Sequence, residues 1–316
     1  MTTHHKGPIL GDNRSAGGIY HNVGLGIVDG HRSPYKIYVE DFTKSMVDGD
    51  LALSGATVSA INTPTTATEV VTNTSGYLLI DPGSKADSGS EVQFDPNVAN
   101  GTAANDVRPL TILGPITSTA TLMDGRELFF QTRVGFQSDS ALNFDGHVMI
   151  GWLTKDTSLI TNTTGVPSVA DGGGFGFYIN GDPGGAAAGA NAYIVPFSDP
   201  AAITADVTRN SGVVVPDLIT DITAASTNKW YTLGAKMRVV DASASTGVTD
   251  FYINGRLVDS IANSTCMDST EVYSMTFAVQ NGPVDLIAVS VDYLITGITR
   301  EGITFPYDAQ ADLAAY

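Results

Sequence analysis

Cysteine is almost absent from this chain of 316 residues. The single thiol, Cys266, has no second cysteine in the chain to pair with, so no intrachain disulfide is possible. A chain of this length buries enough apolar surface to fold without covalent crosslinks. Its stability must therefore come from side-chain packing and hydrogen bonding.

Basic residues are scarce, with 16 Lys and Arg against 33 Asp and Glu and a net charge of −17 at pH 7. Nucleic-acid binding needs clustered Lys and Arg, so we expect no nucleic-acid partner. No apolar run reaches the roughly 18 residues of a membrane span, and no apolar segment follows a basic start as in a signal peptide. We expect synthesis in a host cytoplasm, no secretion and no membrane partner.

Recognisable catalytic motifs are missing too. The chain has no G-x-S-x-G elbow, and residues 172–176 (GGGFG) lack the Lys-Ser/Thr that follows a phosphate-binding loop. His147 is the only histidine within the predicted strands. These absences favour a protein that is not an enzyme and carries no cofactor.

Period-two alternation is what the sequence has in abundance, and it predicts an all-β fold. In residues 229–239 (KWYTLGAKMRV), Tyr231, Leu233 and Ala235 begin an apolar row that continues to position 239. Asn254-Gly255 then predicts a type I′ hairpin that places Phe251 opposite Val258 and Tyr252 opposite Leu257. Further strands are predicted at 38–42, 56–61, 69–72, 77–80, 91–94, 126–136, 147–153, 174–179, 193–197, 213–215, 273–280 and 287–295. The last has the longest alternation and should be central, with Ile287, Val289, Val291, Tyr293 and Ile295 on one face.

The pattern K-W-Y-x-L-x-A-x-M-R-V, followed by D-F-Y-I-N-G-R-L-V, resembles the inner strands of concanavalin A-like (laminin G-like) jelly-roll sandwiches. Residues 289–294 (VSVDYL) resemble a closing strand of the same superfamily, and the resemblance covers residues 126–300. It implies a concanavalin A-like jelly-roll β-sandwich. The superfamily includes lectins, glycosidases and structural virion proteins, so the resemblance alone does not decide the activity.

The glycosidases of this superfamily carry an E-x-D-x-x-E motif on one strand. None of the glutamates here begins such a motif; they are Glu40, Glu69, Glu91, Glu127, Glu271 and Glu301. Glycoside hydrolysis is therefore the last of the functions we consider. Trp152 and Trp230 either stack on sugar rings or belong to the sandwich core.

Two aspartates pose a separate question, because the predicted hairpin places Asp250 and Asp259 opposite each other. Like charges in such a pair destabilise the ribbon, so either a β-bulge separates them or a cation such as Ca²⁺ lies between them. We favour the bulge and expect no metal.

The chain divides into three parts. Residues 1–37 form an extended N-terminal arm with four basic and two acidic residues, 38–300 form the sandwich, and 301–316 form a tail. Residues 38–110 are either a peripheral strand layer or a subdomain. The arm is either a plain basic tail or a docking arm, for which the candidate contact residues are Ile9, Leu10, Arg14, Ile19, Tyr20, Arg32 and Lys36.

Taken together, these features look like a bacteriophage virion structural protein. We expect a capsid decoration or cement protein on the capsid surface, whose arm binds the major capsid protein and which assembles as a homo-oligomer, in particular a homotrimer. The alternative is a glycan-binding receptor-recognition module of the tail-fibre or lectin type.

Overall fold

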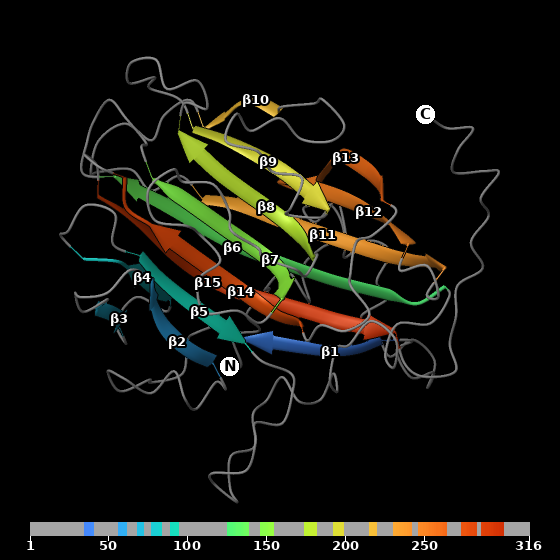
Figure 1. Ribbon diagram of the computed structural model, residues 1–316, viewed down its shortest axis with the longest axis horizontal. Coiled ribbons are helices and arrows are strands. Elements are labelled where there is room, and N and C mark those ends of the chain that lie inside the picture. The colour runs from blue at the N-terminus through green and yellow to red at the C-terminus, as the bar shows by residue number, and fades with distance from the viewer. Residues whose placement is uncertain are drawn as a thin grey trace, which may run out of the picture.

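The computed structural model describes the strands and the short segments beside them, and Figure 1 shows them in two layers. The described residues are 35–40, 56–61, 68–72, 77–83, 89–94, 125–138, 146–154, 174–181, 192–198, 215–219, 230–241, 246–263, 273–282 and 286–299. Their strands are β1 (Tyr35–Glu40), β2 (Ala56–Ile61), β3 (Thr68–Thr72), β4 (Tyr77–Asp81), β5 (Gly89–Phe94), β6 (Glu127–Ser138), β7 (His147–Thr154), β8 (Gly174–Gly181), β9 (Ala192–Ser198), β10 (Val215–Ile219), β11 (Trp230–Asp241), β12 (Thr246–Ile253), β13 (Arg256–Asn263), β14 (Tyr273–Gln280) and β15 (Ile287–Thr299). The all-β fold class is confirmed.

All pairings between the described strands are antiparallel, and they build two sheets. Sheet A has eight strands in the order β13-β12-β11-β6-β15-β4-β3, with β1 also paired to β15. Sheet B has seven, in the order β10-β9-β8-β7-β14-β5-β2. The two sheets pack face to face as a β-sandwich, the architecture that the sequence resemblance implied.

The apolar rows predicted from the alternation meet between the two sheets. Phe130 of sheet A contacts Phe175 and Phe177 of sheet B, and Phe177 in turn contacts Phe251 of sheet A with ring centroids 5.5 Å apart. All four rings are fully buried. Burying a side chain of this size is worth about 1.5–3 kcal/mol, so this layer supplies much of the driving force for folding.

The β12–β13 hairpin turns at Asn254 and Gly255, whose φ angles of 50° and 79° are those of the predicted turn. Tyr252 lies opposite Leu257 as expected, but Phe251 lies opposite Asp259, not Val258. A register shift between these two pairs inserts Val258 as an extra residue. The predicted bulge is thus observed, and Asp250 lies opposite Ser260.

β15 is central, as predicted, but its alternation is interrupted. Its register against β6 shifts between Val291 and Tyr293, so that one face is not continuous along the strand. The first half directs Val291 into the core, whereas the second half directs Leu294 there. Tyr293 and Ile295, which we expected to share a face with Val291, belong to a second apolar cluster.

The strands between residues 38 and 110 complete the two main sheets. β2 and β5 extend sheet B beside β14, and β3 and β4 extend sheet A beside β15. β4 and β1 share one edge of β15, since β4 pairs with its first half and β1 with its second. β1 begins at Tyr35, three residues before the predicted strand, so Lys36 lies in β1 and not in an arm.

Several predictions fall on residues outside the described ranges. They concern the arm contacts Ile9, Leu10, Arg14, Ile19, Tyr20 and Arg32, and the tail at 301–316. Within the described ranges, no helix has the length and apolar character needed to cross a membrane.

Candidate functional site

The outer face of sheet A, opposite the core, carries charged side chains from β6, β11 and β15. Alternation directs Glu127, Lys236 and Arg238 to this face, because their neighbours Leu128 and Met237 point into the core. Two groups of side chains can be distinguished there. One surrounds Glu127 and is buried, and the other surrounds Trp230 and reaches solvent.

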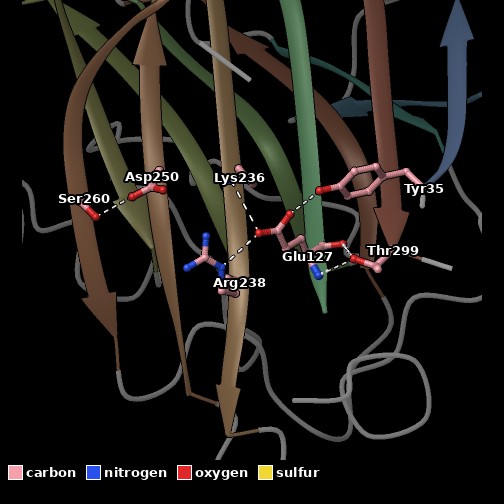
Figure 2. A network of polar contacts seen from close by, with 7 residues as sticks. All are labelled: Tyr35, Glu127, Lys236, Arg238, Asp250, Ser260 and Thr299. Carbon is pink, nitrogen blue, oxygen red and sulfur yellow. Dashed lines mark hydrogen bonds and ion pairs between the residues drawn. The ribbon is translucent and has the colours of Figure 1, made fainter. Parts of the chain in front are cut away.

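The group around Glu127 joins four strands through this one residue (Figure 2). Glu127 Oε1 lies 3.6 Å from Lys236 Nζ and accepts a hydrogen bond from Arg238 Nε at 3.1 Å. Its Oε2 accepts a hydrogen bond from Tyr35 Oη at 2.6 Å. Its backbone N–H donates to Thr299 Oγ1 at 2.8 Å. The network therefore links β1, β6, β11 and β15 at one end of the sheet.

Burial and the Glu127 carboxylate both favour the neutral phenol of Tyr35. The pKa of Tyr35 is raised far above its usual range, first by burial and then by the hydrogen bond to Glu127. The Tyr35 phenol is therefore neutral at physiological pH and donates its hydrogen bond to Glu127. The ring of Tyr35 also packs edge-on against Phe129, with centroids 5.5 Å apart. Tyr35, Glu127 and Lys236 are buried, Arg238 is half-buried, and these side chains pair with one another, so the network acts as a structural clamp.

The second group, which we call the Trp230 cluster, comprises Trp230, Arg133, Asp292 and Tyr77. The indole packs on the backbone of β6 at Gly135, where a Cβ atom would lie 3.3 Å from the ring. The Arg133 guanidinium carbon lies over the indole, 5.1 Å from its centroid. Tyr77 approaches the indole edge-on, with centroids 6.2 Å apart.

The bulge in β15 completes the Trp230 cluster. Asp292 is the residue left without a partner on β6 by the register shift, and its side chain turns toward Arg133. Arg133 Nη1 and Asp292 Oδ2 are 2.9 Å apart, and their side chains are 45% and 34% exposed. Bulges commonly redirect a side chain beside a binding site. An aromatic ring, a donor and an acceptor are thus presented together at an accessible surface.

Sheet B presents a pair formed by one histidine and one tyrosine on its outer face. The rings of His147 (β7) and Tyr178 (β8) are stacked 4° from parallel, and His147 Nδ1 lies 2.8 Å from Tyr178 Oη. Burial lowers the pKa of His147 to about 4 and raises that of Tyr178 above its usual range. At pH 7 the imidazole and the phenol are therefore both neutral, and the imidazole tautomer decides which of them donates the hydrogen bond.

This pair predicts a loss of stability in mild acid. The unfolded chain takes up a proton on His147 near pH 6.5 and the folded chain only near pH 4, so stability falls as the pH drops between these values. We expect about 2–3 kcal/mol of the unfolding free energy to be lost over this interval. Urea denaturation at pH 7 and pH 4.5 measures it, and His147→Gln is the control in which this component should vanish. An unchanged pH dependence in His147→Gln would contradict the assignment.

Three glutamates whose side chains the structure describes lie on three separate surfaces. Glu127 is on the outer face of sheet A, and Glu91 is on the outer face of sheet B, where it accepts a hydrogen bond from Gln93. Glu40 lies on the core side of β1, where its Oε2 accepts a hydrogen bond from Tyr38 Oη at 2.9 Å. Carboxylates on opposite faces of a sandwich cannot flank one glycosidic bond.

The β-bulge determines how Asp250 and Asp259 are placed. Asp250 Oδ1 accepts a hydrogen bond from Ser260 Oγ at 2.6 Å (Figure 2), and the two aspartates are no longer opposite each other. Among the described residues, no three His, Cys, Asp or Glu side chains are grouped as metal ligands would be.

The two tryptophans have different roles. Trp152 is fully buried in the core, and its Nε1–H donates to Thr296 Oγ1 across the two sheets at 3.1 Å. Trp230 is half-buried on the outer face of sheet A. Only Trp230 is therefore placed to contact a ligand. Trp230 is a candidate from the sequence alone. Arg133 and Asp292 come together only through the register of β15 against β6.

Known proteins resemble the chain in strand arrangement alone. No protein-family model and no curated protein matches it. Similar solved structures include the alginate lyase Aly36B, at 13% identity over 86% of this chain and 99% of that chain, with a TM-score of 0.49. Peanut lectin with a nine-residue peptide has 10% identity over 84% and 97% of the two chains and a TM-score of 0.47. The metal-free carbohydrate recognition domain of Emp46p has 10% identity over 81% and 95%, with a TM-score of 0.43.

The described strands define an all-β sandwich of two antiparallel sheets. A fold of this class does not determine the activity, which depends on the side chains of the site.

Proposed function

We propose that the protein is a non-catalytic carbohydrate-recognition module that binds its glycan at the Trp230 cluster. One observation carries the proposal: a half-buried indole lies beside an accessible guanidinium and an accessible carboxylate. Sugar rings are recognised by an aromatic surface for their C–H groups and by planar donors and acceptors for their hydroxyls. The cluster offers all three together, with Arg133 from β6, Trp230 from β11 and Asp292 from β15.

Accessibility also favours this surface. Sheet A carries the large apolar side chains that are exposed in the described part of the chain, Val39 and Leu257. By contrast, β5 and β14 of sheet B are buried along both faces. Glu40, Glu91 and Glu127 lie on separate surfaces, which supports binding without hydrolysis. The proposal depends on these side chains and not on similarity to any lectin.

The proposal predicts that binding depends on Trp230. We expect Trp230→Ala to weaken glycan binding at least about tenfold, as loss of a central aromatic contact does. Leu257→Ala is the matched control, because Leu257 is 47% exposed on the same sheet but lies outside the cluster. A glycan array followed by calorimetry measures both variants. Equal affinities for Trp230→Ala and the unmodified protein would contradict the proposed site.

Fluorescence gives an independent readout. The chain has two tryptophans, so Trp152→Phe leaves Trp230 as the sole indole. A ligand at the cluster should then change the emission of Trp230 in a saturable way. A bound glycan that leaves this emission unaltered would place the site elsewhere.

Capsid decoration is a second candidate function, favoured by how the chain enters the sandwich. β1 pairs with β15, and Tyr35 is held by Glu127, so the residues that precede it start from a fixed position on sheet A. Such an anchor suits an arm that docks on a major capsid protein. Deleting residues 1–32 should then abolish capsid occupancy while leaving the melting temperature unchanged. Light scattering tests the expected homotrimer, and undiminished occupancy would refute the role of the arm.

A further inference from the structure

The charge balance of the Trp230 cluster indicates which glycans it accepts. Arg133 contributes the only cation among its four members, and Asp292 offsets that charge at 2.9 Å. Trp230 and Tyr77 carry no charge. The cluster is therefore neutral overall, on a protein whose net charge is −17.

A negative ligand gains little from such a surface. The attraction of Arg133 for an anion is cancelled locally by Asp292, and the remaining acidic residues repel the anion at longer range. The side chains of both residues are exposed, so the ion pair itself is weak and either partner can turn toward a ligand.

A neutral polyol, in contrast, finds complementary groups. The Asp292 carboxylate accepts hydrogen bonds from a pair of hydroxyls, and the Arg133 guanidinium donates to a hydroxyl or ring oxygen. The indole packs on β6 and has Arg133 over its ring, and the part of this half-buried side chain that stays exposed supplies an apolar surface for the C–H groups of the sugar. We propose that the cluster selects neutral, polyhydroxylated glycans against uronic-acid glycans. This inference rests on the proposed glycan-binding function.

The test uses matched pairs of hexasaccharides that differ only at C6: mannan and mannuronan, glucan and glucuronan, galactan and galacturonan. Titration calorimetry with the full chain measures the affinity for each member. We expect a neutral member to bind, with its oxidised counterpart at least about fivefold weaker at low salt. Asp292→Asn removes the carboxylate that offsets the charge of Arg133, so it should reduce or reverse the ratio of the affinity for the neutral member to that for the acidic member. Added salt should also narrow the ratio, because exposed charges are screened.

The outcomes separate this inference from the proposed function. If the unmodified protein binds uronic-acid members as tightly as neutral ones, the charge inference fails while glycan binding stands. An unchanged ratio in Asp292→Asn, with an unchanged melting temperature, also overturns it. If no member of any pair binds and the glycan array is negative, the proposed function itself fails.

Discussion

Replacing Glu127 with alanine is expected to lower the free energy of unfolding by about 3–5 kcal/mol, among the largest effects of any single substitution in this protein. The carboxylate is 4% exposed and lies beside Lys236, which is 8% exposed, and Arg238. Its removal leaves two cations and the Tyr35 hydroxyl without their shared acceptor (Figure 2). A buried charge that loses its partner destabilises a fold far more than an intact pair stabilises it. Urea denaturation at pH 7 measures the loss.

Two further variants distinguish charge from packing. Tyr35→Phe removes one hydrogen bond to a carboxylate and should cost about 1.5–3 kcal/mol, less than Glu127→Ala. Lys236→Met, combined with Glu127→Ala, removes a buried cation that has lost the Glu127 carboxylate, and it should recover part of the stability. If the double variant is as unstable as the sum of its single variants, the buried ion pair is not the cause.

The fold could be predicted from the sequence because period-two alternation is a local signal. In β11 the row from Tyr231 to Val239 points into the core as predicted, and in β14 the row from Tyr273 to Val279 does the same. The Asn254-Gly255 turn was likewise predicted from two residues and confirmed by their φ angles. Each of these inferences needs only neighbouring residues.

The bulge in β15 could not be predicted in this way. One extra residue reverses the face of every side chain that follows, so Tyr293 and Ile295 lie outside the core although they continue the row of Val291. No glycine or proline marks the shift between Val291 and Tyr293. It becomes visible only when β15 is paired with β6.

Both groups on sheet A depend on the pairing of β6 with its two neighbours, β11 and β15. Glu127 meets Lys236 and Arg238 from more than a hundred residues away, and Arg133 meets Asp292 across 159 residues of sequence. Alternation assigns each residue to a face of the sheet, but it does not say which residue lies beside it on the adjacent strand. The sequence therefore identified Trp230 as a candidate, whereas its partners required the strand register.

Replacing Trp152 with alanine is expected to cost about 3–5 kcal/mol of unfolding free energy, as truncation of a buried large aromatic does. Trp152 is fully buried, and its indole N–H joins sheet B to Thr296 of sheet A. The melting temperature and urea midpoint measure the effect.

Trp152→Phe is the matched variant that keeps an aromatic ring but removes the donor. Thr296 retains a partner there, because its Oγ1 donates to the backbone oxygen of Phe129 at 2.6 Å. We therefore expect Trp152→Phe to cost about 1–3 kcal/mol, less than alanine, and to leave glycan affinity unchanged. A loss of affinity at full stability would instead place Trp152 in the binding surface, which its complete burial between the two sheets opposes.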